Sequence, residues 1–190
     1  KTLVNLAKAV EGEFDYPQSN RHLLDALRLL ESAADHTVFD ECLCLNAMGT
    51  NLYGQGKFQE ARKQFELARQ KAIGSQSIAP LHDAEIDVNL AWISVDERDF
   101  STAAALFQRA LQTMHEHYGE EHLRTVEMEY YLARVEALSG TPDAAARRLT
   151  SALQKREAFV DRLTQASLSD RDRFSLVQEF RVHFESIVWP

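Results

Sequence analysis

Residues 46–68 read NAMGTNLYGQGKFQEARKQFELA, and this stretch decides the fold. Its second half places small and large apolar residues at steps of four and three, at Ala61, Phe65 and Ala68. This spacing puts the three side chains on one face of a helix. The glycine-bearing segment 54–57 that precedes it predicts a short turn between two antiparallel helices.

The same pattern recurs at a spacing of 42 residues without a gap, so that four segments of the chain align. Three of the aligned columns hold Leu6, Met48, Leu90 and Leu132; Leu23, Phe65, Phe107 and Leu149; and Ala26, Ala68, Ala110 and Ala152. Because one helix pair cannot cover its own apolar face, successive pairs must stack. We therefore expect an all-α solenoid with first helices near 1–12, 39–54, 82–97 and 122–139 and second helices near 18–35, 57–73, 100–117 and 142–166.

The repeat also predicts the organisation of the chain. We expect a repeat array over 1–168, with units at about 1–37, 38–79, 80–121 and 122–168, followed by a capping and connecting helix over 169–190. An apolar stripe at steps of three and four defines that last helix and consists of Phe174, Val177, Phe180, Phe184 and Ile187. Since the stripe continues to Trp189, we expect Phe184, Ile187 and Trp189 to contact a following domain as well.

Composition narrows the classes of function. The chain has 190 residues and a formal net charge of −8, with acidic and basic side chains interspersed. Phosphate binding needs a basic stripe, so the sequence predicts no nucleic-acid groove. It contains no run of about 18 apolar residues, which predicts no membrane span. Cys42 and Cys44 diverge around a helix, and we expect reduced, buried thiols in a cytoplasmic protein.

The run 46–49 followed by Gly56, Phe58, Ala61, Phe65 and Ala68 resembles the tetratricopeptide repeat. The likeness covers most of the chain, although the Trp usual in the first helix is absent and Pro142 replaces the aromatic residue of the last unit. The long unit and the connector 118–122 are similar to those of kinesin light chains and of many bacterial signalling proteins. The resemblance implies a right-handed α-solenoid whose first helices line a concave groove that binds a protein segment.

The family positions that face such a groove carry amides, aromatic rings and charges in this sequence. They are Asn5, Lys8, Asn46, Thr50, Tyr53, Asn89, Trp92, Tyr130, Tyr131 and Arg134. An asparagine amide both donates and accepts hydrogen bonds, which suits it to hold the main chain of an extended peptide. Tyrosine and tryptophan are enriched at binding hot spots. Packing between adjacent helices is the alternative role of these rings, above all for Trp92 and Tyr131.

No pattern in the sequence predicts catalysis, a cofactor or a metal. His115 and His117 diverge on a helix, and His115, His117 and His122 are expected to be solvated side chains and not zinc ligands. A second cysteine pair, a nucleophile elbow and a glycine-rich phosphate loop are all absent from the sequence. We therefore expect this chain not to be an enzyme.

The segment around 154–159 and 167–174 resembles the junction between a tetratricopeptide array and a caspase-like CHAT protease domain. That likeness implies a regulatory or recruiting module that controls a downstream protease. Two alternatives remain open, a structural oligomerisation scaffold and a sensor domain for a small signalling peptide.

Overall fold

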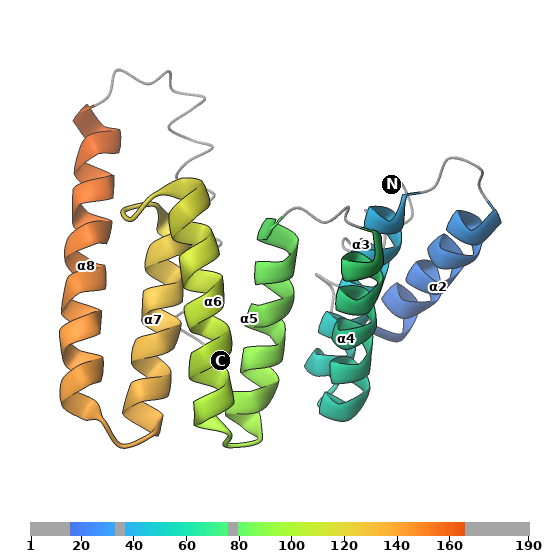
Figure 1. Ribbon diagram of the computed structural model, residues 1–190, viewed down its shortest axis with the longest axis horizontal. Coiled ribbons are helices and arrows are strands. Elements are labelled where there is room, and N and C mark those ends of the chain that lie inside the picture. The colour runs from blue at the N-terminus through green and yellow to red at the C-terminus, as the bar shows by residue number, and fades with distance from the viewer. Residues whose placement is uncertain (1–15, 33–36, 76–79, 166–190) are drawn as a thin grey trace. The chain divides into compact units, whose positions relative to one another are not determined.

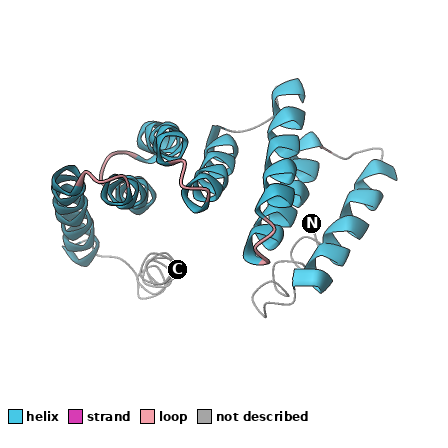
Figure 2. Cartoon of the chain, turned by 90° about the horizontal axis from the view of Figure 1, so that it is seen from below, coloured by secondary structure: helices cyan, strands magenta, loops and turns pink. Residues whose placement is uncertain are grey.

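The computed structural model describes residues 16–32, 37–75 and 80–165. The described residues form helices joined by short loops and contain no strand (Figure 2). The helices, labelled in Figure 1, are α2 (Tyr16–Ser32), α3 (Val38–Gly54), α4 (Phe58–Ser75), α5 (Pro80–Asp96), α6 (Phe100–Tyr118), α7 (Leu123–Leu138) and α8 (Pro142–Gln165). The bounds agree to within a few residues with those predicted by the repeat, although the predicted helices at 1–12 and 169–190 lie outside the described residues.

The turns inside three helix pairs share one backbone conformation. Gly56, Arg98 and Gly140 all have positive φ, of 72°, 62° and 87°. These three residues are 42 positions apart, so each repeat reverses its chain at the same place. A left-handed residue just after a helix lets backbone N–H groups satisfy the last carbonyls, as in the bonds from Lys57 to Leu52 O and from Asp99 to Ser94 O.

By compactness the chain divides into two units, Lys1–Leu106 and Phe107–Pro190. In the first unit, Leu23 and Ala26 of α2 pack on Cys44 and Ala47 of α3. A larger cluster joins α3, α4 and α5 and contains Leu45, Leu52, Ala61, Phe65, Ala68, Ile86, Leu90 and Ile93. The predicted column of Ala61, Phe65 and Ala68 is therefore the interior face of α4.

Gly49 sets the distance between the two helices of its pair. A Cβ atom built there would lie 2.7 Å from Cδ1 of Phe65, which is too close for two carbon atoms. The side chain of Phe65 is 1% exposed, so it occupies the space that a larger residue at position 49 would need. The small residue predicted at this column is thus required by close approach of α3 and α4.

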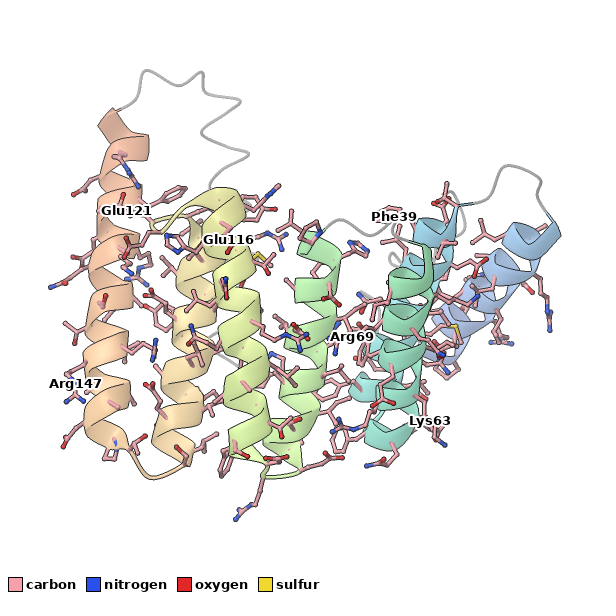
Figure 3. The ribbon with its side chains drawn as sticks, viewed as in Figure 1. Phe39, Lys63, Arg69, Glu116, Glu121 and Arg147 are labelled. Atoms are coloured by element: carbon pink, nitrogen blue, oxygen red, sulfur yellow. The ribbon has the colours of Figure 1, made fainter. Side chains whose placement is uncertain are left out.

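Ion pairs tie helices of the first unit together at half-buried positions. Lys71 of α4 binds Glu41 of α3 at 2.5 Å, within one pair. Arg69 reaches from α4 toward α5 (Figure 3), where it lies 3.2 Å from Asp83 and also pairs with Asp87. Because Asp87 is 2% exposed, Arg69 supplies the partner that a buried carboxylate requires.

The second unit contains α7, α8 and most of α6. Phe107 of α6 is fully buried, and its ring centroid lies 5.3 Å from that of Tyr131 on α7. Between α7 and α8, Arg148 donates to Glu136 at 2.7 Å and Lys155 donates to Glu129 at 2.7 Å. These two bonds are seven residues apart on both helices, which fixes the antiparallel register of the pair.

Candidate functional site

Three contacts join the first helices α3 and α5 at regular steps. They are Phe39 with His82 (ring centroids 4.8 Å apart), Asn89 Nδ2 with Asn46 Oδ1 (3.0 Å) and Tyr53 Oη with Asp96 Oδ2 (2.6 Å). Seven residues separate successive contacts on each helix, which is about two turns, or roughly 10 Å. The contacts therefore lie in a row along one face of each helix, and we call this row the α3–α5 ladder.

The middle contact of the ladder pairs two amides. It uses one N–H of Asn89 and the carbonyl oxygen of Asn46, and both residues are half-buried. A primary amide carries two N–H donors and an oxygen with two lone pairs. The Asn46 amino group and the Asn89 oxygen take no part in this bond, so the pair retains a donor and an acceptor, the two kinds of group that bond to a peptide main chain.

Tyr53 and Thr50 differ in what they offer at this face. The half-buried ring of Tyr53 packs 5.4 Å from that of Phe58, while its hydroxyl donates to Asp96. Thr50 is exposed, but its hydroxyl donates to the carbonyl oxygen of Asn46 in its own helix at 3.1 Å. Trp92 of α5 is half-buried. Tyr53 therefore brings an aromatic ring and a nearby carboxylate to the ladder.

The structure brings together three of the seven residues predicted in the first unit. Asn46, Tyr53 and Asn89 belong to the ladder, whereas Asn5 and Lys8 lie outside the described residues. Sequence reasoning missed Phe39 and His82, the first pair of the ladder. The feature of the sequence that could have revealed this pair is its separation of 43 residues, which also separates Asn46 from Asn89 and Tyr53 from Asp96.

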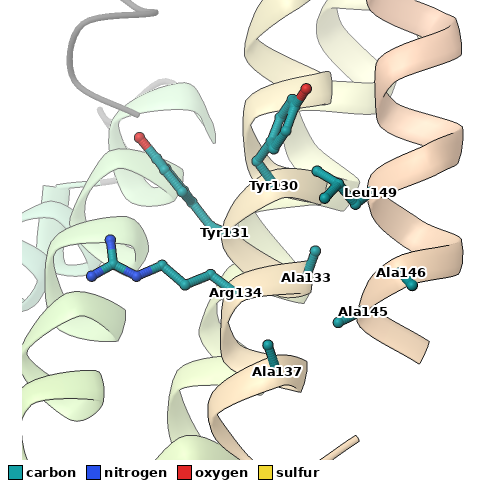
Figure 4. A pocket seen from close by; sticks show the side chains of 8 residues that line it. All are labelled: Tyr130, Tyr131, Ala133, Arg134, Ala137, Ala145, Ala146 and Leu149. Carbon is teal, nitrogen blue, oxygen red and sulfur yellow. The ribbon is translucent and has the colours of Figure 1, made fainter. Parts of the chain in front are cut away.

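The second unit contains three of the residues predicted for the groove, Tyr130, Tyr131 and Arg134. They line one pocket of about 270 Å³ between α7 and α8. The lining residues are Tyr130, Tyr131, Ala133, Arg134, Ala137, Ala145, Ala146 and Leu149. Tyr130 and Leu149 approach each other from the two helices, while Tyr131 and Arg134 point away from α8 (Figure 4). Alanines from both helices therefore give the pocket a largely apolar lining.

Burial raises the pKa of the Tyr130 phenol, and the positive charge of Arg156 offsets part of this effect. Because the pKa of free tyrosine is already about 10, the hydroxyl remains protonated at neutral pH and can donate a hydrogen bond. Tyr130 is therefore a neutral amphipathic group at the rim of an apolar pocket.

The described residues contain no group of three or more His, Cys, Asp or Glu side chains arranged to hold a metal ion. His115 and His117 are exposed as predicted, but His122 is not simply solvated. Its Nδ1 accepts from the backbone N–H of Arg124 at 3.2 Å and caps α7, and its ring stacks on Tyr118 at 4.5 Å. Loop geometry that brings Tyr118 and His122 together was not visible in the sequence.

The two cysteines are structural. Both are free and buried, and burial is the largest cause that raises the pKa of each thiol, to about 11 for Cys44. Thiols with raised pKa hold little thiolate at neutral pH and react slowly. Among the described helices, none is both long and apolar enough to cross a bilayer.

Paired antiparallel helices and a 42-residue period define a helical-repeat fold, and a row of polar and aromatic side chains runs along its first helices α3 and α5. Residues 42–73 and 88–124 match the tetratricopeptide repeat family. Over these residues the chain is similar to tetratricopeptide repeat proteins. Proteins of this family are typically non-catalytic and generally mediate contacts between proteins.

Solved structures support the same fold. The crystal structure of the apo form of RapI superimposes with a TM-score of 0.72 at 14% identity, over 97% of this chain and 67% of that one. The crystal structure of BtubC (BKLC) from P. vanneervenii gives 0.60 at 17% identity, over 83% of this chain and 79% of that one. No curated protein matches the sequence. The predicted all-α solenoid class is confirmed.

Proposed function

We propose that this protein binds an extended segment of a partner protein along the α3–α5 ladder. The observation that carries the proposal is the amide pair of Asn46 and Asn89, bonded at 3.0 Å. The pair retains a donor and an acceptor, so it can bond to the backbone C=O and N–H of a bound residue whatever the side chain of that residue. Tyr53, Thr50 and Trp92 lie on the same two helices and add aromatic and polar contact area.

The negative charge near Tyr53 favours a bound segment that carries basic residues. Tyr53 donates to the exposed Asp96, and the chain as a whole carries a net charge of −8. A partner segment with a lysine or arginine level with Asp96 gains a favourable charge pair and approaches an acidic protein faster. We therefore propose main-chain recognition of a segment that is basic near this end of the ladder.

Tyr130, Tyr131 and Arg134 form a second proposed contact region, in the second unit. Their pocket is large enough for an aliphatic side chain or a ring, and Tyr130 offers a hydroxyl donor beside it. Control of a downstream protease domain stays a prediction from the resemblance to CHAT-associated proteins, as does a cytoplasmic location. Detection of a small signalling peptide is a narrower form of the same proposal.

The test uses a peptide ligand selected from a random displayed library against the intact chain. Replacing Asn46, Asn89 and Tyr130 together with alanine is expected to weaken the measured Kd more than tenfold, while the circular dichroism spectrum stays unchanged. A matched control replaces the exposed second-helix amides Gln70, Gln108 and Gln154 with alanine and should bind normally.

A second arm tests whether the main chain is what the asparagines hold. Single N-methylation along the selected peptide removes one N–H at a time and should abolish binding at the position that faces Asn89. If the triple variant binds as tightly as the parent chain, the binding site lies elsewhere. Self-association of the chain in light scattering, together with unaltered peptide binding, would instead favour an oligomerisation scaffold.

A further inference from the structure

A second pocket between α7 and α8, of about 340 Å³, has a polar lining. It shares no residue with the pocket beside Tyr130. Its lining residues are Glu129 and Glu136 of α7 and Ala144, Arg147, Arg148 and Ser151 of α8. The two glutamates are seven residues apart, so they lie on one face of α7 with their Cα atoms about 10 Å from each other. The pocket therefore has carboxylates at two separate levels.

Each of these carboxylates has one oxygen bonded to α8 and one oxygen left over. Oε1 of Glu129 accepts from Lys155 at 2.7 Å, and Oε1 of Glu136 accepts from both Nε and Nη2 of Arg148, at 3.0 and 2.7 Å. The Oε2 atoms of both glutamates are buried and have no hydrogen-bond partner among the described residues. Glu129 as a whole is 9% exposed. Because a buried acceptor without a donor is destabilising, both atoms mark places where a bound molecule can supply N–H groups.

The charges around the pocket favour a cationic ligand. Lys155 lies 2.7 Å from both Glu120 and Glu129, so one ammonium group serves two carboxylates. The other glutamate of the pocket has one arginine as its partner. Among these described residues, three carboxylates therefore share two cations. Arg147 also lines the pocket, but it is exposed, and the solvent screens its charge.

The separation of the two unpaired oxygens restricts the ligand further. Their carboxylates are held apart because their partners Arg148 and Lys155 are also seven residues apart, on α8. A metal ion bonds to oxygen at about 2.0–2.6 Å and cannot reach both. A lysine or arginine side chain of a partner protein has its donors only at its tip. A linear aliphatic polyamine has an ammonium group at each end, and its methylene groups can lie on Ala144.

We propose that this pocket binds a linear aliphatic polyamine whose terminal ammonium groups donate to Oε2 of Glu129 and of Glu136. Ser151 lies between Arg148 and Lys155 along α8 and lines the same pocket, so its hydroxyl can accept from an amine in the middle of the ligand. The inference does not rest on the proposed function, because this site belongs to the second unit and the α3–α5 ladder to the first.

The test titrates the intact chain with spermidine at physiological ionic strength and measures the Kd by isothermal titration calorimetry. Putrescine, a shorter diamine, and butylamine, a monoamine, are titrated in the same way. Spermidine is expected to bind at least tenfold more tightly than butylamine, with putrescine between them. Glu129→Gln and Glu136→Gln should each weaken the Kd for spermidine at least fivefold, since each variant removes the charge of one carboxylate.

The matched control is Glu157→Gln, which removes one negative charge from an exposed position of α8 outside the pocket. Its Kd for spermidine should equal that of the parent chain. Ala144→Leu keeps both carboxylates and fills part of the pocket, so it should weaken binding at least fivefold. This variant tests the site even where a glutamine variant fails to fold, and circular dichroism checks the folding of each.

Three results would overturn the proposal. Spermidine may fail to bind the folded parent chain at all. An equal loss of affinity in Glu157→Gln and Glu129→Gln would mean that spermidine is attracted only by the net charge of the protein. Butylamine or argininamide binding as tightly as spermidine would mean that a single cationic group is enough, as in a basic side chain of a partner protein.

Discussion

At the scale of one residue, Phe107 shows how a buried side chain in a repeat column contributes to the stability of the fold. Its side chain is fully buried and packs on the ring of Tyr131. Replacing Phe107 with alanine leaves a cavity that the surrounding helices cannot fill, and we expect a loss of about 3–5 kcal/mol in the free energy of unfolding. Urea titration followed by circular dichroism measures this loss.

The neighbouring Gln108 provides the control, because it is exposed on the same helix. Its replacement with alanine should change the free energy of unfolding by no more than about 0.5 kcal/mol. A loss below about 1 kcal/mol for the Phe107 variant would contradict an interior position and with it the alignment of the repeats.

Individual columns also show where sequence reasoning stops. Ile93 and Val135 are buried apolar residues, and the sequence offers no reason to expect the buried Asn51 at the same column. The structure supplies the reason, because the Asn51 amide donates to Ser19 at 2.8 Å and to Asn20 at 2.9 Å on α2. Periodicity identifies a buried position, but the partner of a polar side chain depends on contacts between helices that the sequence does not specify.

At the scale of the helix–turn–helix element, the left-handed residue after each first helix makes a separate prediction. Gly56 has a φ of 72° and no neighbouring atom within 4 Å of a built Cβ, so only the backbone opposes a side chain there. Gly56→Ala should therefore cost about 1 kcal/mol of unfolding free energy, as expected for a left-handed alanine. Thermal and urea denaturation can both measure it.

The equivalent turn of the third helix pair allows the opposite substitution, in which glycine replaces a residue that has a side chain. Arg98 is exposed with a φ of 62°, so Arg98→Gly should be more stable than Arg98→Ala by about 1 kcal/mol. Equal stability of these two variants would mean that the turn relaxes to another conformation. The sequence predicted a break between the helices at 82–97 and 100–117, but it could not reveal the shared geometry, since arginine stands where the other two turns have glycine.

At the scale of the whole molecule, the 42-residue period predicted the order and bounds of the described helices because each column combines burial with helical spacing. The period did not predict that α8 has 24 residues when α4 and α6 have 18 and 19. Nor did it predict the α3–α5 ladder, which depends on the offset between neighbouring first helices. Of the ten residues predicted for the groove, Asn5 and Lys8 lie outside the described residues, and the role of the other eight in binding stays a prediction.

We expect the C-terminal segment to contribute to the stability of the whole array by covering apolar residues of the fourth helix pair. A terminal repeat needs a cover for its apolar face, and Leu149 and Leu138 of the fourth pair are 38% and 49% exposed. Deleting residues 169–190 removes the apolar stripe that the sequence predicts for the capping helix. The melting temperature should then fall by several degrees, and the exposed surface should bind a hydrophobic dye such as ANS. A truncated chain that stays monomeric, binds no dye and melts at the same temperature would show that the fourth pair is stable without a cover, since the apolar area lost would then contribute nothing to folding.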